Sequence, residues 1–381
     1  MSAKQITGKR TRQSLRHLFR SMMLPVIAAC IFPAQSVQAQ NQSDAEAKAW
    51  EKRASVAIID DATFYQNLRV PTAEVLNQTL VEPQFALRYR NSWTISTSLV
   101  GLESTREAAP IDAENSTDSQ MRVRELFGKY STGDFELTVG RKLVRWGTGY
   151  AFTAAGVLDP PIMPANPTDR LGVNVGRDLV KLDFTRSTNS LSVAWTTAAF
   201  SQADANLHEA GAIRYNALIH GFDTSAIVYG QSGGEIEGGL TWTRVFGNSW
   251  EFHGEAMWQD HPTFLMGGKY TLPNGIDLIA EYFTPSPTFQ LGANSRQQDV
   301  FLYAGKHRLR ELPGWNKWNV AASGVANLAD GSSITIIDIS RGFGDHFTAY
   351  THIELPRGSS TSLYGASPYS VAPSFGVRFQ L

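Results

Sequence analysis

Apolar and polar residues alternate along most of the chain, in segments of about ten residues separated by turn residues. The clearest segment starts at Trp250, where Phe252 and Trp258 fall on the same face and Glu251 and Glu255 fall on the other. Because successive side chains of a strand point to opposite faces, this pattern predicts strands with one apolar and one polar face. The same alternation recurs in residues 191–199, 276–282, 347–355 and 374–381.

The predicted strands are joined by connections of two alternating lengths. Tight turns such as 247–248 alternate with mostly longer connections such as 147–175. Outer-membrane barrels have short periplasmic turns and longer outer loops, so the pattern favours an all-β fold, a closed antiparallel transmembrane β-barrel of about 16–18 strands. A count of eighteen strands requires a first strand near residues 64–70. Two connections depart from the alternation: a short turn at 261–262 and a long one at 308–315.

Composition agrees with alternating strands. Only 18% of the residues are charged and 11% are aromatic, and no apolar run reaches the length of about eighteen residues that a membrane helix needs. The mean hydropathy of −0.21 shows that apolar residues are spread among polar ones. The chain has a net charge of −1, and the part after the N-terminal segment has no basic run that could neutralise phosphates, which argues against nucleic acid as a partner.

The N-terminal residues have the pattern of an export signal. A cationic region precedes the short apolar stretch 22–32, and small residues end at Ala39, so we expect residues 1–39 to be a signal peptide cleaved after Ala39. The alternative is a lipoprotein signal in which Cys30 is lipidated. We expect residues 40–62 to be a polar periplasmic segment and residues 63–381 to form the barrel, exported to the outer membrane of a Gram-negative cell.

The last residues place Phe375, Val377, Phe379 and Leu381 at alternate positions that run to the end of the chain. This resembles the β-signal by which the barrel-assembly machinery recognises outer-membrane proteins. The family pattern prefers a terminal aromatic residue, usually Phe, so Leu381 is a departure. The alternative is an ordinary final strand of a soluble β-sandwich, because sandwich strands alternate as well.

A second resemblance covers about forty residues, 122–161. The run 140–147 (GRKLVRWG), with Arg124-Glu125-Leu126 before it and 158–161 (LDPP) after it, is similar to a largely uncharacterised family of Gram-negative barrels that carry a GRQ-hydrophobic-x-WG strand end. The short motifs bear on architecture more than on activity.

The connection 147–175 is long and contains four prolines, which stiffen it. We expect it to fold into the lumen as a constriction or cap, with Asp159, Asp169 and Arg170 exposed to solutes; a surface loop without a transport role is the alternative. Charged residues on the predicted inner faces complete the candidate pore-lining set: Lys181, Arg214, Glu251, His253, Glu255, Asp277, Glu281 and Glu354. Their acidic excess is consistent with a cation-tolerant pore, but an ordinary solvated polar interior is the preferred explanation.

The predicted function is a non-enzymatic, porin-like channel for small polar solutes or ions. The expected partners are outer-membrane lipids, the barrel-assembly machinery and the solutes, and association into a homo-oligomer is left open. A plugged barrel with a structural, adhesion or export role is the alternative. Neither adjacent acid–His pair, Asp260-His261 or Asp345-His346, has a flanking catalytic motif, and nothing in the sequence predicts a metal site or a cofactor.

Overall fold

A computed structural model describes residues 50–66, 73–90, 92–108, 116–159, 171, 174–197, 209–258, 262–284, 298–309 and 315–381. Among these residues no helix is long and apolar enough to cross a bilayer. The strands are β1 (Trp50–Phe64), β2 (Ala73–Tyr89), β3 (Trp93–Ala108), β4 (Ser116–Thr132), β5 (Phe135–Lys142), β6 (Arg177–Arg186), β7 (Asn189–Thr196), β8 (Ala210–Ile219), β9 (Phe222–Gln231), β10 (Ile236–Phe246), β11 (Trp250–Trp258), β12 (Thr263–Thr271), β13 (Ile276–Thr284), β14 (Asp299–His307), β15 (Trp318–Asn327), β16 (Ser333–Phe343), β17 (Phe347–Arg357) and β18 (Ala372–Gln380).

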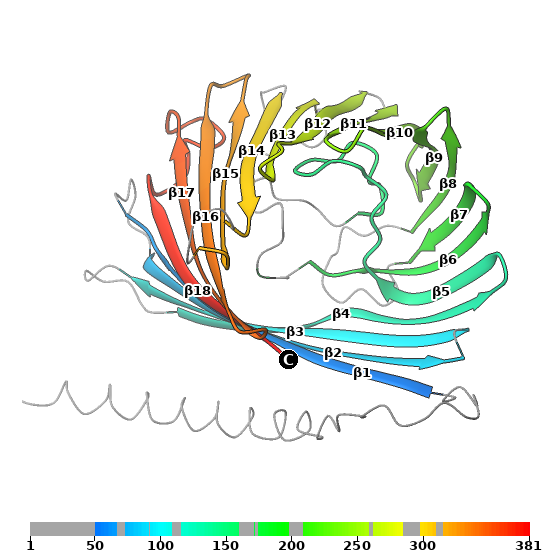
Figure 1. Cartoon of the computed structure of the whole chain (residues 1–381), viewed down its shortest axis with the longest axis horizontal. Coiled ribbons are helices and arrows are strands. Elements are labelled where there is room, and N and C mark those ends of the chain that lie inside the picture. The colour runs from blue at the N-terminus through cyan, green and yellow to red at the C-terminus, as the bar shows by residue number, and fades with distance from the viewer. Residues whose placement is uncertain are drawn as a thin grey trace, which may run out of the picture. The chain divides into compact units, whose positions relative to one another are not determined.

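These strands form one closed 18-stranded sheet (Figure 1). Each strand pairs antiparallel with its neighbours in the chain, and β1 pairs with β18 as well as with β2. The register at closure places Asp60 opposite Val377, and the backbone N–H of Leu381 donates to the carbonyl of Val56 at 3.0 Å. Every strand of the barrel therefore has two partners, and the predicted all-β fold is confirmed at the upper predicted strand count.

The two faces of the sheet differ in polarity, as the alternation predicts. On β11 the side chains of Trp250 and Trp258 are 46% and 49% exposed on the outside, whereas His253 and Glu255 are buried on the inside. Other strands repeat the arrangement: on β7, Val193 faces outward and its neighbours are buried. Exposed apolar side chains on one face of a closed sheet and polar ones on the other are typical of strands that meet lipid outside and water inside.

Aromatic side chains gather at the end of the barrel where the turns are short. Trp93 packs on Tyr130 across β3 and β4 with ring centroids 4.5 Å apart, and Trp250 stacks on Tyr270 at 4.1 Å. Both pairs lie within a few residues of a turn. Tyr and Trp prefer the boundary between hydrocarbon and water, so this belt marks one membrane interface.

The barrel begins earlier than we expected. Residues 50–62, assigned above to a periplasmic segment, belong to β1, which pairs with β2 from Trp50↔Tyr89 to Phe64↔Val75. The polar first residues of this stretch join the sheet because β2 offers a full set of backbone partners. Local sequence could not show that, since its first residues are polar and the partner strand is long.

The two classes of connection are confirmed. The turns after β2, β4, β6, β8 and β10 are short, and the connections after β5, β7, β13 and β17 are long. Several short turns use a left-handed residue, such as Gly247 with φ 60° and Gly275 with φ 78°, which glycine adopts without strain. The two predicted exceptions are also present, at 259–262 and 308–317.

Candidate functional site

After β5 ends at Lys142, the chain turns into the barrel instead of returning directly as a hairpin (Figure 1). We call residues 143–159 the inner segment. Its departure point is fixed by Arg141, whose guanidinium forms two hydrogen bonds with the Asp178 carboxylate on β6, at 2.8 and 2.9 Å. The Glu125 carboxylate on β4 accepts the backbone N–H of Leu143 at 2.9 Å. These two contacts direct the chain inward.

The Glu255 carboxylate on β11 is the main anchor of the inner segment. It is 4% exposed and accepts six hydrogen bonds, of which the five of ordinary length measure 2.6 to 3.1 Å. The donors are the backbone N–H groups of Thr148, Gly149, Ala154 and Ala155 and the hydroxyls of Thr148 and Thr153. A carboxylate that accepts several N–H groups satisfies backbone that has no partner in a sheet or helix.

Glu281 on β13 holds the next part of the segment. Its carboxylate accepts the N–H groups of Tyr150 and Ala151, the latter at 2.9 Å, and it contacts Nε2 of His253 at 2.9 Å. His253 is fully buried, and its ring lies edge-on to the Tyr150 ring at 5.5 Å. The imidazole therefore orients the carboxylate that binds the segment, because Nε2–H donates to it.

Asp159 closes the segment on itself. Its carboxylate accepts the N–H of Trp146 at 2.5 Å and the N–H of Gly147 at 3.0 Å. Burial raises the pKa of Asp159, and these two hydrogen bonds oppose that rise. Gly156 is required inside this turn, since a Cβ there would lie 2.4 Å from the Thr153 hydroxyl.

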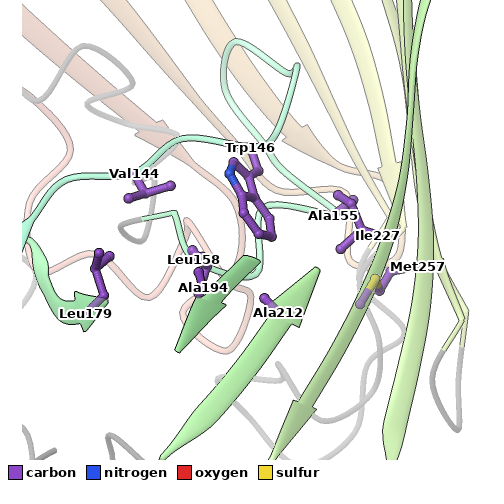
Figure 2. Close-up of a cluster of buried hydrophobic side chains, with 9 residues drawn as sticks. All are labelled: Val144, Trp146, Ala155, Leu158, Leu179, Ala194, Ala212, Ile227 and Met257. Atoms are coloured by element: carbon purple, nitrogen blue, oxygen red, sulfur yellow. The ribbon is translucent and has the colours of Figure 1, made fainter. Parts of the chain in front are cut away.

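Apolar contacts attach the segment to two parts of the wall. Figure 2 shows Trp146 and Leu158 in a cluster with inward side chains of β6, β7, β8, β9 and β11, including Leu179, Ile227 and Met257. A second cluster joins Phe152 to β12, β14, β15 and β16. The Phe152 ring also stacks on Phe283 at 4.9 Å. Burying a side chain as large as Trp146, which is 3% exposed, contributes about 2–3 kcal/mol.

The predicted pore-lining residues fall into two groups. Glu255, Glu281, His253 and Asp159 are buried under or within the inner segment, so the expectation that Asp159 is exposed to solutes is wrong. The physical reason is that each carboxylate satisfies backbone N–H groups of the segment. Glu255 and Glu281 therefore do not contribute to the charge that a solute meets, because these two carboxylates are covered.

Of the other predicted residues, Glu251 also contacts the inner segment, and the rest face inward and pair with other side chains of the barrel. Lys181 contacts Asp183 at 2.6 Å, and the Arg214 guanidinium donates to the Ser225 hydroxyl at 2.9 Å. The remaining contacts are Tyr150 hydroxyl to Glu251, Lys269 to Asp277, and both Tyr369 hydroxyl and His352 to Glu354. Asp169, Arg170, Cys30 and the pair Asp260-His261 lie outside the described residues.

Two motifs quoted from the sequence meet in space. Trp146-Gly147 at the end of the GRKLVRWG run donates to Asp159 of the LDPP run. Sequence reasoning missed the roles of Glu125 and Asp178, although Glu125 and Arg141 lie within the same motifs. The sequence did contain a signal for Glu125. A strand end that leads into a long connection leaves backbone N–H groups without partners, and a nearby carboxylate can accept them.

The residues of the proposed assembly signal face outward on β18. Phe375, Val377 and Leu381 are 53%, 37% and 59% exposed, while the intervening Ser374 is fully buried. His346 of the pair Asp345-His346 lies in the turn after β16, where its Nδ1 contacts the carbonyl of Gln380 at 2.8 Å.

A closed antiparallel sheet with an apolar outside, a polar inside and a chain segment fixed in its lumen defines a transmembrane β-barrel of the outer-membrane type. Solved structures share this fold. The Pseudomonas aeruginosa protein OpdQ matches with a TM-score of 0.58 and 10% sequence identity over 87% of this chain and 99% of that chain. OccK11 (OpdR) from the same organism matches with a TM-score of 0.57 and 12% identity, over 87% and 96%. OccK5 (OpdH), also from that organism, matches with a TM-score of 0.56 and 9% identity, over 87% and 98%. No protein-family model matches the chain, and no curated protein matches it either.

Proposed function

We propose that the chain is a non-enzymatic channel of the Gram-negative outer membrane that passes small polar solutes or ions through a lumen narrowed by the inner segment. The observation that carries this proposal is the closed barrel with polar inner strands and a segment anchored across the lumen by Glu255 and Glu281. The short turns are placed at the periplasmic side and the long connections outside, as in barrels of this type.

The inner segment acts as a fixed constriction in this proposal. Its contacts to β11 and β13 are hydrogen bonds to buried carboxylates, and its apolar side chains pack on both neighbouring parts of the wall. A segment held in this way does not need a ligand to stay in place. Solute size would be limited by the space between this segment and the strands on the opposite side.

Conductance in planar bilayers tests the proposal. The purified wild-type protein is expected to give stable unitary steps, and the double variant Glu255→Ala/Glu281→Ala is expected to give larger steps, because the segment loses its anchors. Glu136→Ala is the matched control: Glu136 also faces inward, but it pairs with Lys129 at 2.8 Å and has no contact with the segment. Equal steps in all three proteins would contradict the constriction.

A plugged barrel is the second candidate, and the two apolar clusters favour it because together they hold the segment against the wall from β6 to β16. A wild-type protein that inserts into the bilayer and shows no conductance, with steps appearing only in the double variant, would establish the plug.

Gel migration that changes on boiling, combined with outer-membrane fractionation, tests the proposed location of the barrel. N-terminal sequencing of the mature protein tests cleavage after Ala39.

A further inference from the structure

A groove of about 460 Å³ lies on the outside of the barrel across β15 to β18, β1 and β2. Its outward lining includes Trp318, Arg341, Phe343, Ala349, Phe375 and Val377. Phe343, Phe375 and Val377 are 45%, 53% and 37% exposed, so the groove opens to the face that meets lipid. From β15 to β2 it crosses five interstrand spacings, or about 24 Å.

Small residues hollow its floor. Ala349 lies opposite Val377, and Gly376 follows on the inner face of β18. On the inner face a Cβ at Gly376 would lie 2.3 Å from the Tyr350 ring, so glycine is needed there to leave room for that ring. The depression on the outer face is built by Ala349 on β17 and Ala62 on β1, whose small side chains lie opposite Val377 and Phe375.

Arg341 is a cation on this lipid-facing surface. Its guanidinium lies over the Trp318 ring at 5.3 Å and over the Phe343 ring at 4.8 Å from the centroids. Its Nε is buried and has no hydrogen-bond partner in the described part of the chain. Arg341 lies two residues before the end of β16, at the short-turn end, which the proposed orientation places at the periplasmic leaflet. Arginine at a membrane interface meets lipid phosphate, whose oxygens match its planar fork.

Two acids line the groove, of which Asp61 is buried on the inner face. Asp60, on the outer face, is too far away to neutralise this cation. Asp60 is on β1, three strands from Arg341, which is about 14 Å across the sheet. Its carboxylate already accepts the Thr79 hydroxyl at 2.8 Å. The positive charge of Arg341 is thus left for an anion from the bilayer.

We propose that the groove binds a phospholipid of the periplasmic leaflet, with its phosphate on Arg341 and an acyl chain along Ala349, Val377 and Phe375. The proposal rests on the membrane placement proposed above. Aromatic rings flank the cation at the interface, and Ala349 and Val377 lie beside it in the same register row. Ile339 and Phe375 lie two residues nearer the bilayer centre, so apolar side chains lead from the cation toward the hydrocarbon.

Arg244 provides a matched control. Its guanidinium lies 4.4 Å from the ring centroids of both Phe222 and Phe246, and it also lies two residues before a short turn, at the end of β10. It does not line the groove. Arg244 and Arg341 therefore share charge, aromatic contacts and position along the strand. They differ in that only Arg341 lines the groove.

Native mass spectrometry of the full barrel in detergent, titrated with phosphatidylglycerol, tests the proposal. We expect Arg341→Gln to weaken lipid binding about tenfold, while Arg244→Gln stays within about twofold of wild type. Ala349→Phe, which fills the groove without changing charge, is expected to weaken binding as well. Diacylglycerol, which lacks the phosphate, and inorganic phosphate alone are expected to bind poorly to the wild type.

Several results would overturn the lipid site. Equal binding by wild type and Arg341→Gln, or equal losses in both arginine variants, would show only general attraction to the aromatic belt. Lipid-free oligomers that disappear in Arg341→Gln would show that a second copy of the chain occupies the groove. Folding of each variant is checked by heat-modifiable migration, and unchanged conductance of Arg341→Gln separates the lipid site from the channel proposal.

Discussion

The carboxylate of Asp159 accepts the backbone N–H of Trp146 at 2.5 Å, and this contact joins the two ends of a loop that lies inside the barrel. Asp159→Ala would leave the N–H groups of Trp146 and Gly147 buried without partners, which costs about 1–3 kcal/mol for each group. We expect faster amide hydrogen exchange in residues 146–159 while the strands keep their protection. Glu136→Ala is the control, and unchanged exchange in Asp159→Ala would contradict the role of this contact.

Trp146→Ala tests the apolar attachment of the same segment. Removing a buried indole leaves a cavity against Ile227 and Met257, with an expected loss of about 3–5 kcal/mol of local stability. The expected readout is conductance with larger or noisier steps than the wild type. Trp195→Ala is the matched control, because Trp195 faces outward and is 51% exposed. If the two variants behave alike, the packing of the segment does not set the pore.

The carboxylate of Asp330 connects two outer connections and gives a pH-dependent prediction. It accepts the N–H of Leu363, and both the N–H and hydroxyl of Ser332. Partial burial alone raises the pKa of Asp330, and these hydrogen bonds outweigh it, so its pKa lies below the ordinary value. A lowered pKa in the folded state means that the stabilisation is present above the unfolded-state pKa and is lost as the pH falls through the folded-state pKa.

We therefore expect the amides of Leu363 and Tyr364 to lose exchange protection on acidification, after correction for the intrinsic pH dependence of exchange. The window begins near the ordinary pKa of about 3.9 and extends below it. Asp330→Asn should lack most of this pH dependence. Protection that is independent of pH in the wild type would show that Asp330 does not hold these connections together.

Much of the barrel could be predicted because side-chain direction in a strand has a period of two. The assignments of Val193, Trp250 and Phe375 to the outer face need only that period, and the structure confirms them. The start of β1 at Trp50 could not be predicted in this way, since its first residues are polar and are held by β2.

The candidate site was only partly predictable for a different reason. The proline content and length of 147–175 indicated an inward loop, but not which carboxylates would meet it. Glu255 and Ala155 are 100 residues apart in sequence, and their contact depends on the three-dimensional path of the segment. The alternating pattern shows only that an acid lies on the inner face. It does not show whether that acid meets water or is covered by a loop.

Phe375→Arg tests the outward face of the last strand. A cation on the lipid side of a barrel costs about 2–4 kcal/mol near the bilayer centre, so we expect a lower yield of folded barrel. The yield is measured by heat-modifiable migration of outer-membrane fractions. Ser374→Ala changes the inner face of the same strand and is expected to have little effect. Equal yields for the two variants would contradict the assignment of these faces.

The pairing of β1 with β18 makes the first and last strands neighbours although the whole barrel separates them in sequence. Among the described residues, closure of the sheet is therefore the pairing of strands furthest apart in sequence, and it cannot form until β18 has been exported. Before then β1 and the growing end both present unpaired backbone groups, which favour pairing with other chains. The barrel thus has to be kept from such encounters during export, and a truncation that removes β18 is expected to produce aggregates instead of a smaller barrel.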